Sequence, residues 1–571
     1  MISARIARWA TVTNRLDLTR RAVLAGGAGA AAVAGTTARS AAACPAAAHQ
    51  PFQHGVASGD PLPGAVVLWT RVTPTPEATP GSGLGPAVTV SWEVAADARF
   101  RDVVRRGRVG TDAGRDHTVK LDATALRPDT AYFFRFTLDG QRSPVGRTRT
   151  APADTADPDH LRFGVVSCAN LQAGWFSAYR HLAAREDLQA VIHLGDYLYE
   201  YAPGEYGYGR ANTDIRPHVP AREMVSLADY RQRHAQYKAD RDLQALHARH
   251  PFIVTWDDHE VANDQWRDGA ENHQPEEGDY AARRAAAHRA YDEWMPVRLS
   301  GTVDIDDGTQ LFRTLRFGGL AELSMLDLRS HRDQQAATPA PSPVPSTGGG
   351  GDRTITGRGQ LDWLKERLRR DGPQWKLVGN PVMIAPVTFA QLPHDVVDPV
   401  NDVAGLLPRD GAPYNVDQWD GYTADRRELF DHIRDNGVKD VVFLTGDIHS
   451  GWACDLPHDA ATYPVGDSAG VELVCTSVTS NNLKDITGSP RRTSSLAVEA
   501  VLQTNNRHVK YLNFDDHGYS VLDVTPERVQ MDWYVIGDRA DRDAGSSWTA
   551  SWATRSGTNK VQAVSAPVGG A

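Results

Sequence analysis

The chain has 571 residues, of which 41% are hydrophobic and 23% charged, and its formal net charge is -10. This length is enough for a large core and a second domain. Residues 1–43 contribute +5 through six Arg and one Asp, so the rest of the chain is near -15. That balance excludes a nucleic-acid footprint, which needs clustered Lys and Arg, and suits a site that gathers carboxylates around cations.

Residues 1–43 have the parts of an export signal. A basic segment ends in Arg20–Arg21, an apolar run spans Ala22–Gly35, and small residues follow at Ala41–Ala43. The paired arginines resemble a twin-arginine signal, which implies the twin-arginine export machinery as a partner and a secreted, extracellular chain. A disordered Ala-rich terminus is the alternative. Lipoprotein anchoring through Cys44 is disfavoured because Ala41 stands where a Leu is usual, and no other stretch is a transmembrane candidate.

Short alternating segments fill residues 52–150, which we predict to form a separate β-sandwich domain. Turn pairs such as Asp60–Pro61 and Asp139–Gly140 separate the segments, as is typical of all-β sandwiches. Leu126–Phe136 resembles the end-of-sandwich signature of fibronectin type III modules, with Tyr132 as the corner residue. The predicted strands are Val66–Val72, Val88–Val94, His117–Leu121 and Ala131–Leu138.

From residue 160 apolar strands alternate with helices, which predicts an α/β domain over 160–540. Residues 201–219 read as a long surface loop over the strand ends, and residues 334–352 as a low-complexity break. The pattern does not define the structure of the tail, 541–571. Helices are expected at Trp175–Asp187, Ser226–His250, Gln360–Arg370 and Ala424–Asn436, the last capped by Gly437, and strand-like alternation at Gly518–Gly537.

Four apolar runs end in side chains that can bind a metal. They supply Cys168 in FGVVSCAN, Asp196 and Tyr199 in VIHLGDYLYE, Asp258, His259 and Asn263 in FIVTWDDHEVAND, and Asp447 and His449 in VVFLTGDIHS. Open α/β sheets place ligands at the carboxyl ends of their strands, so we expect these groups to converge. Each of these residues could instead have a purely structural role: Cys168 could be a buried strand cysteine and His449 a core histidine. Their occurrence at four strand ends favours a metal site.

The donor types indicate two kinds of cation. Thiolate, phenolate and imidazole suit a transition metal such as iron, whereas carboxylate and amide oxygens suit Ca²⁺, Mg²⁺ or Mn²⁺. Asp196 is the natural bridge between them. Two cations about 3.5 to 4 Å apart would lower the pKa of a bound water and neutralise charge on a phosphoryl group during in-line attack. The set therefore predicts phosphoester hydrolysis by a metal-bound hydroxide.

The motifs GDYLYE, WDDHEVAND and GDIHS occur in this order, with SCAN before them and VASGDP opening the predicted sandwich. They resemble the alkaline phosphatase D (PhoD-like) family of metallophosphoesterases over roughly residues 52–540. The resemblance implies a four-layer α-β-β-α sandwich that holds Fe³⁺ and one or two Ca²⁺. It places Cys168, Asp196, Tyr199 and His449 on iron, and Asp196, Asn263 and Asp447 on calcium, with Asp258 as a further candidate ligand.

By the same resemblance, His259 is the candidate for steadying the phosphoryl oxygens or protonating the leaving group, and Asn380 is a candidate phosphate contact. Phosphomonoesters, phosphodiesters and phospholipids all remain possible substrates, because phospholipase D-type phosphodiesterases are an alternative within the family. Residues 201–219 and 391–418 are expected to decide between them. A non-catalytic calcium-dependent binding protein is the alternative from another class. Cys454 and Cys475 are a candidate disulfide in an oxidising compartment.

Overall fold

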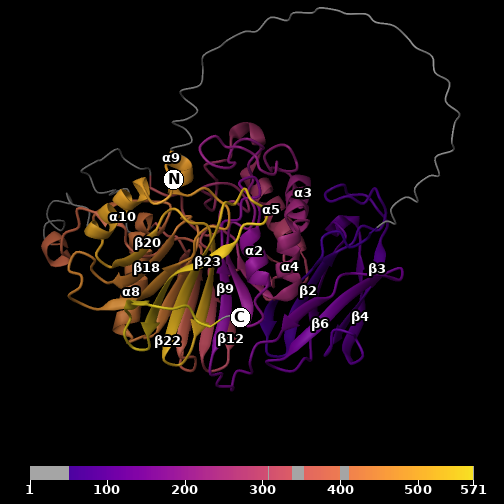
Figure 1. Cartoon of the computed structure of the whole chain (residues 1–571), viewed down its shortest axis with the longest axis horizontal. Helices are drawn as coiled ribbons and strands as arrows, with labels where there is room; N and C mark the ends of the chain where they lie inside the picture. The colour runs from indigo at the N-terminus through magenta and orange to yellow at the C-terminus, as the bar shows by residue number, and fades with distance from the viewer. Residues whose placement is uncertain (1–49, 306–307, 337–352, 399–409, 570–571) are drawn as a thin grey trace, which may run out of the picture. The chain divides into compact units, whose positions relative to one another are not determined.

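The computed structural model describes residues 50–305, 308–336, 353–398 and 410–569. The predicted signal, Cys44 and most of the low-complexity break therefore lie outside the described residues. Figure 1 shows two large sheets, with helices beside them and a smaller sheet built from the N-terminal part of the chain. The predicted mixed α/β class is confirmed.

The larger sheet has ten strands, with β9, β10 and β11 parallel at its centre. These three are short, and apart from the half-buried Arg162 all their residues are buried, as strands covered on both faces should be. In sheet order the strands are β24 (Val561–Val564), β23 (Ser546–Arg555), β22 (Arg528–Ile536), β21 (Gly518–Val524), β9 (Leu161–Val166), β10 (Ala190–Leu194), β11 (Phe252–Thr255), β1 (Val56–Leu62), β2 (Ala65–Arg71) and β5 (Thr118–Ala123).

A second sheet of seven strands stacks on the first. Side chains from both sheets, among them Phe163, Ile192, Leu323 and Leu444, form one buried apolar cluster between them. In sheet order its strands are β12 (Arg313–Phe317), β13 (Ala321–Met325), β14 (Trp375–Asn380), β17 (Val441–Thr445), β19 (Ser468–Val474), β18 (Gly451–Pro457) and β20 (Val509–Asn513). A separate pair is formed by β15 (Thr388–Phe389) and β16 (Ala412–Pro413).

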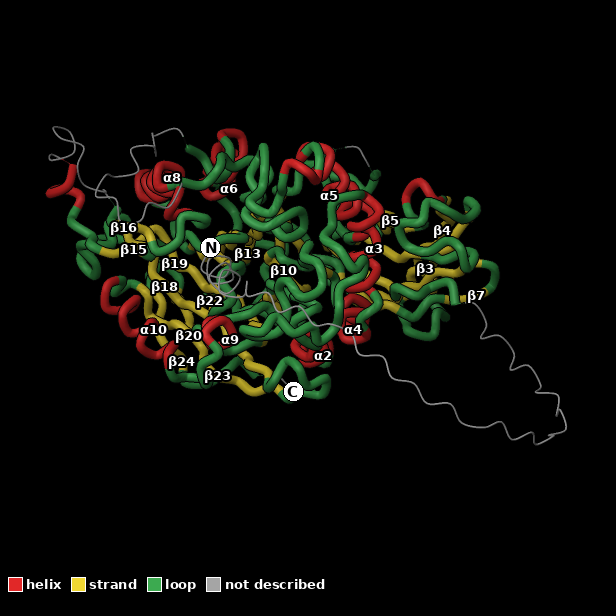
Figure 2. The backbone as a smooth tube through the Cα atoms, turned by 90° about the horizontal axis from the view of Figure 1, so that it is seen from above, coloured by secondary structure: helices red, strands yellow, loops and turns green. Residues whose placement is uncertain are grey.

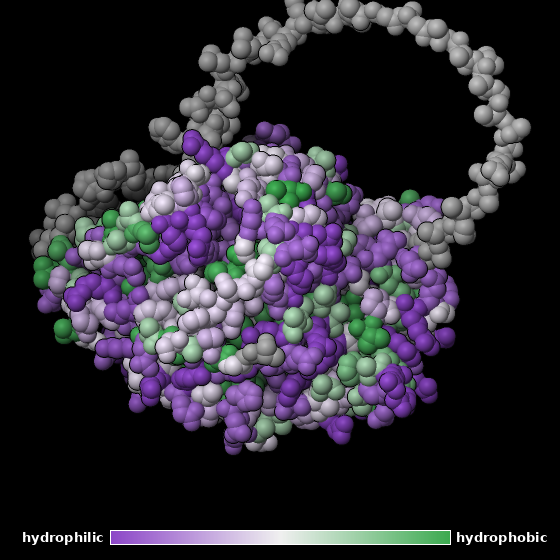
Figure 3. All heavy atoms as spheres, in the orientation of Figure 1, coloured by the Kyte–Doolittle hydropathy of each residue, from purple (hydrophilic) through white to green (hydrophobic). Residues whose placement is uncertain are grey.

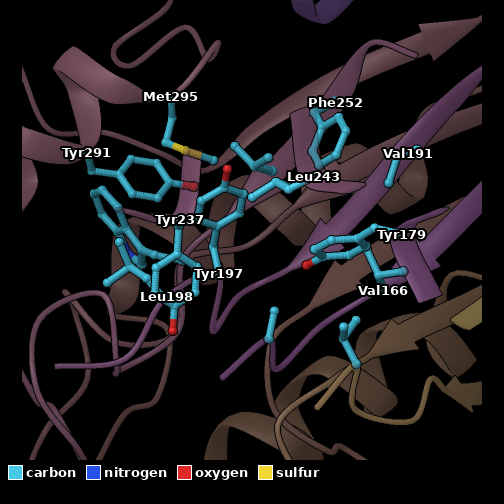
Figure 4. Packing of buried hydrophobic residues seen from close by; sticks show 14 of the residues in the cluster. Val166, Tyr179, Val191, Tyr197, Leu198, Tyr237, Leu243, Phe252, Tyr291 and Met295 are labelled. Carbon is cyan, nitrogen blue, oxygen red and sulfur yellow. The ribbon is translucent and has the colours of Figure 1, made fainter. Parts of the chain in front are cut away.

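Helices pack on the outer face of each sheet. Figure 4 shows Tyr179, Tyr237, Leu243 and Tyr291 of four helices packed with strand residues such as Val191 of the ten-stranded sheet. These helices are α2 (Ser177–Ala183), α3 (Leu227–Lys238), α4 (Arg241–Arg249) and α5 (Tyr280–Trp294). The seven-stranded sheet is covered by α6 (Arg358–Arg369), α8 (Thr423–Asp435) and α10 (Ser494–Asn505), and Figure 2 shows α6 and α8 side by side.

The predicted N-terminal strands divide between two sheets. A five-stranded sheet contains β4 (Val103–Thr111), β3 (Val88–Ala95), β6 (Ala131–Leu138), β7 (Gln141–Arg142) and β8 (Gly146–Arg149). The others, β1, β2 and β5, extend the ten-stranded sheet, since Gly59 pairs with Phe252 of β11. The Tyr132 hydroxyl accepts a hydrogen bond of 3.0 Å from the Arg127 amide, which is the corner contact expected of this residue.

One predicted helix differs from expectation: the helix predicted at 226–250 is interrupted at Asp240, which caps α4. The tail, whose structure the sequence did not define, forms β23 and β24. Short elements complete the fold: η1 (Ala113–Arg115), η2 (Pro275–Glu277), η3 (Trp419–Gly421) and α9 (Leu483–Thr487). No helix among the described residues is long and apolar enough to cross a membrane. The face drawn in Figure 3 is mostly hydrophilic, with apolar residues in scattered patches.

Candidate metal centre

The four predicted strand ends meet where the two sheets approach each other. Cys168 follows β9, Asp196 follows β10 and Asp258 follows β11, all in the ten-stranded sheet, whereas Asp447 follows β17 of the other. Gly446 allows this approach, because a Cβ atom there would lie 2.8 Å from the Cβ and Oγ atoms of Ser167. The convergence that the sequence predicted is therefore present.

The backbone is left-handed at the points where the ligands leave their strands. The φ angles are 58° at Cys168, 54° at Asp196, 63° at Asp447 and 51° at His449. Non-glycine residues rarely adopt such angles, and they persist where surrounding structure holds them for a function. Gly195, with φ of 99°, lets the chain pass close to Asp257. These turns direct the four side chains toward one region.

Cys168, Asp196 and His449 form one buried group, in which one ligand atom of each lies within 4.8 Å of the others. The Tyr199 hydroxyl joins them, since it donates to Asp196 Oδ2 at 2.8 Å and lies 3.3 Å from His449 Nε2. The other ring nitrogen of His449 is 2.8 Å from the Asn481 carbonyl oxygen, which leaves Nε2 for the group. All four predicted iron ligands are thus together.

Two further groups of possible metal ligands adjoin this one: the second shares Asp196 with the first, and the third shares Asp258 with the second. Asp196, Asp258 and His259 lie within 4.8 Å, and so do Asp258, Asp264 and Asp417. Asp264 and Asp417 were not predicted. Asp264 ends the WDDHEVAND motif and could have been found there, whereas Asp417 lies in the 391–418 segment without any local pattern that marks it.

The carboxylates fit bound cations. Asp196 Oδ1 and Asp258 Oδ1 are buried and have no hydrogen-bond partner among the described residues, which is rare for carboxylate oxygens in a protein interior. Burial, together with the neighbouring Asp258 and Asp257 charges, raises the pKa of Asp196 well above its usual value. A cation at this place would satisfy the free oxygens and offset the repulsion.

Arg329 is a resident cation beside these carboxylates, and the sequence analysis missed it. Its guanidinium is fully buried, makes a two-pronged ion pair with Asp257 and lies 2.9 Å from Asp417. It also lies 3.7 Å from Asp258 and 3.6 Å from Asp447. Despite its own burial, these carboxylates raise the pKa of Arg329 well above its usual range, so it stays charged.

His259 is held by a carboxylate that was also not predicted as functional. Its Nδ1 lies 2.7 Å from Glu200 Oε2, and Glu200 Oε1 accepts from the Asn263 amide at 2.8 Å. Burial opposes protonation, but the charges of Glu200, Asp258 and Asp196 prevail and raise the pKa of His259 well above its usual range. His259 therefore lies in one buried group with Asp196 and Asp258, and its ring is held by Glu200.

The side chain of Asn263, a predicted calcium ligand, makes a hydrogen bond through its amide nitrogen. Its Nδ2 donates to Glu271 Oε2 at 3.3 Å, and its side chain is buried. Glu260, the last residue of the Asp-Asp-His-Glu string, instead accepts the backbone amides of Asp196, Tyr197 and Asp257 at 2.6 to 3.1 Å. Glu260 thereby ties two of the motif loops together.

Asn380 does not reach the site, which contradicts the predicted phosphate contact. Its Nδ2 donates to the Val382 carbonyl at 2.6 Å and to Thr445 Oγ1 at 3.1 Å, and its Oδ1 accepts from Trp419 Nε1 at 3.0 Å. The amide is thus engaged by Thr445 of β17, by Trp419 of η3 and by the backbone just after β14. His193, in β10, is also buried, and its Nε2 lies 3.0 Å from the Tyr179 hydroxyl.

The predicted disulfide between Cys454 and Cys475 is absent, because both are free thiols. Cys454 belongs to the apolar cluster on the helix-covered face of the seven-stranded sheet, whereas Cys475 belongs to the cluster between the sheets. Cys454 lies in β18 and Cys475 follows the neighbouring strand β19. Their side chains point to opposite faces of the sheet, so the two sulfur atoms cannot bond.

Comparison with known proteins agrees with this geometry. Residues 163–533 match the family PhoD-like phosphatase, and residues 37–152 match the PhoD-like phosphatase, N-terminal domain. The chain is 37% identical over 511 residues to alkaline phosphatase D of Bacillus subtilis (strain 168), covering 89% of this chain and 82% of that protein. A solved structure of PhoD superposes with a TM-score of 0.79 at 35% identity, covering 92% of this chain and 94% of that one. The chain therefore belongs to the PhoD-like phosphatase family and is a phosphoric ester hydrolase.

Proposed function

We propose that the converged strand ends hold Fe³⁺ and Ca²⁺ and hydrolyse phosphomonoesters, phosphodiesters or both. Iron would be held by Cys168, Asp196, Tyr199 and His449, and calcium by Asp196, Asn263, Asp447 and Asp258. The observation that carries this proposal is the pair of buried oxygens, Asp196 Oδ1 and Asp258 Oδ1, that lack partners among the described residues. Oxygen-rich ligands favour calcium, while the thiol, phenol and imidazole favour a softer metal.

The cations, when bound, would supply an activated water and neutralise charge on the phosphoryl oxygens. Asp196 would hold both, and its membership of the group with Cys168 and of the group with Asp258 supports this role. His259 would donate a proton to the leaving oxygen, and the contact with Glu200 supports this role because it keeps the ring in one orientation. Arg329 keeps Asp257 fixed and moderates the repulsion between the calcium-side carboxylates.

Membership in a hydrolase family argues against the non-catalytic alternative. The phospholipase D-type alternative would use the same metal ligands, because a phosphodiester substrate needs only room for a second ester group. The proposal also includes the finer features expected from the sequence: a four-layer α-β-β-α catalytic domain over 160–540, a fibronectin III-like N-terminal domain over 52–150, and twin-arginine export of the chain. The helix-covered outer faces and the Tyr132 corner contact support the first two.

The test is turnover of a simple phosphomonoester and a matched phosphodiester at alkaline pH with Ca²⁺, alongside metal content by mass spectrometry. Wild type should turn over at least one ester, and Asp196→Ala should lose both metals and turnover. The exposed Asp362 in α6 offers a matched control, since Asp362→Ala removes a carboxylate far from the strand ends. Full turnover by Asp196→Ala, or metal binding without turnover of either ester, would overturn the proposal.

A further inference from the structure

Three consecutive residues, Thr479 to Asn481, contact most of the iron-side ligands; we refer to them as the 479–481 segment. The Ser480 hydroxyl donates to Tyr199 Oη at 2.6 Å, and the amides of Thr479 and Ser480 both reach the Cys168 carbonyl at 3.2 Å. The Asn481 carbonyl faces His449 Nδ1 at 2.8 Å. One short segment thus sets the orientation of residues that come from three different strand ends.

The side chain of Asn481 extends this arrangement to the loop above the site. Its Oδ1 accepts from the Gly209 amide at 3.0 Å, and its Nδ2 donates to the Gly207 carbonyl at 2.8 Å. The adjoining Tyr206 ring lies 5.8 Å from Tyr199 and 6.4 Å from His259, measured between ring centroids. The loop turn and the metal ligands are therefore fixed by the same residue, which is 3% exposed.

Arg539, which follows β22, holds the 479–481 segment from the other side. Its Nη2 donates to Asn481 Oδ1 at 2.5 Å, and its Nη1 donates to the Thr479 carbonyl. The guanidinium is balanced by Asp485 at 3.1 Å, and it lies 4.8 Å from the Tyr208 ring centroid. It is 2% exposed, so solvent does not replace these contacts if they are lost.

We infer that Arg539 is a positioning residue for this active site. Through the 479–481 segment it fixes the groups that orient Cys168, Tyr199 and His449, and it clamps the Gly207–Gly209 turn above them. The fork geometry is what matters, because two separate nitrogens serve two acceptors, which a lysine ammonium cannot reproduce. The part that concerns metal ligands rests on the proposed function, whereas the clamp on the turn does not.

The experiment uses the full-length protein with Arg539→Lys and Asn481→Ala, measured by hydrogen exchange of residues 205–213 and by kcat and KM on the ester turned over by wild type. Both variants should exchange faster in this segment. Arg539→Lys should lower kcat about 10- to 100-fold, the range found when partners of metal ligands are removed. If Arg539→Lys fails to fold, Asn481→Ala still tests the clamp.

Arg491 provides the matched control. It also forms a two-pronged pair with a carboxylate, Asp516, but it is 57% exposed and does not contact the 479–481 segment. Arg491→Lys should match wild type in exchange and in kcat. Wild-type exchange and wild-type kcat in Arg539→Lys would overturn the inference. Absence of ester turnover by the wild-type protein would overturn the proposed function instead, while the exchange measurement would still decide the clamp.

Discussion

The left-handed turns at the ligand positions show how single residues store strain for the site. Such conformations cost roughly 1–3 kcal/mol each at non-glycine residues. At Cys168 and Asp196 the turn is stabilised by neighbours, because the Cys168 amide bonds to the Gly195 carbonyl and the Ala169 amide bonds to the Asp196 carbonyl. Glycine would relieve the strain at either place, but it would remove the ligand. The strain is therefore retained where chemistry needs the side chain.

Cys168 gives the sharpest test at this scale. Burial and then the Asp196 charge raise the pKa of its thiol well above the usual value, so a thiolate forms here only when a cation offsets these effects. Cys168→Ser replaces the soft sulfur by a hard oxygen of similar shape. We expect iron content to fall at least tenfold and any visible absorption band to shift, while calcium content is retained. Metal analysis and absorption spectroscopy check both.

The control for Cys168→Ser is Cys454→Ala, which removes another fully buried thiol from the far face of the seven-stranded sheet. It should lower stability by about 1 kcal/mol through lost packing and leave the iron content unchanged. Equal iron content in wild type and Cys168→Ser would show that the thiol only fills space.

Among the elements, the strand ends could be predicted and their partners could not. Buried parallel strands leave continuous apolar runs in the sequence, and Gly-Asp after such a run marks its carboxyl end. Arg329 and Asp417 follow no such run directly, and their role appears only in the structure, where Arg329 pairs with Asp257, which follows β11, and with Asp417. Asn380 misled for the opposite reason, because a Gly-Asn at a strand end can serve the sheet itself.

For the helices too, the local pattern could be predicted and the packing partners could not. The α3 and α4 pair was predicted as one helix, because the sequence stays helix-favouring through Asp240, yet that side chain accepts the amides of Asp242 and Leu243 and starts a new helix. The turn lets α4 pack on α2 while α3 packs on α5. Local capping could have been recognised, but the change in direction is set by these contacts.

Gly446 links the two sheets and offers a test at the scale of elements. Gly446→Ala would place a Cβ atom 2.8 Å from Ser167 Cβ and 3.4 Å from Leu194 Cβ, so β17 and β9 would have to separate. We expect the free energy of unfolding to fall by about 1–3 kcal/mol, the usual effect of overpacking. Urea unfolding followed by circular dichroism measures it.

The matched control is Gly359→Ala in α6, where a Cβ atom would meet nothing within 4 Å. Alanine is favoured over glycine in a helix by about 0.5–1 kcal/mol, so this variant should be unchanged or more stable. A Gly446→Ala protein as stable as Gly359→Ala would show that the sheets tolerate a wider separation at the site.

On the scale of the whole molecule, both ends of the described chain complete the ten-stranded sheet. The N-terminal β1 pairs with β11, and the C-terminal β23 and β24 extend the sheet beyond β22. The pairing of β1 with β11 could not be read from the sequence, because Gly59 and Phe252 are far apart in the chain. The β-sandwich pattern of residues 52–150 therefore does not reveal which strands leave for the larger sheet.

This extended core contains several histidines for which burial outweighs any nearby carboxylate, which makes the free energy of unfolding depend on pH. Burial lowers the pKa of His54, His193 and His250 to about 3 and that of His508 to about 4. Below pH 6.5 the unfolded chain takes up protons at these positions while the folded chain does not. Their contribution to stability is thus complete above pH 6.5 and is lost as the pH falls toward 3, by up to about 1.4 kcal/mol per pH unit and histidine.

His193 on β10 isolates one such contribution, because its ring contacts the Tyr179 hydroxyl at 3.0 Å and no carboxylate among its described hydrogen-bond partners. His193→Asn removes the titrating group, so the free energy of unfolding should fall less steeply between pH 7.5 and 5.5, by about 1 kcal/mol over this interval. The lost packing lowers stability equally at both pH values, so urea unfolding of chelated protein separates the two effects. His160→Asn, at an exposed position before β9, should keep the wild-type slope. Identical slopes for wild type and His193→Asn would mean that folded His193 takes up its proton as readily as the unfolded chain does.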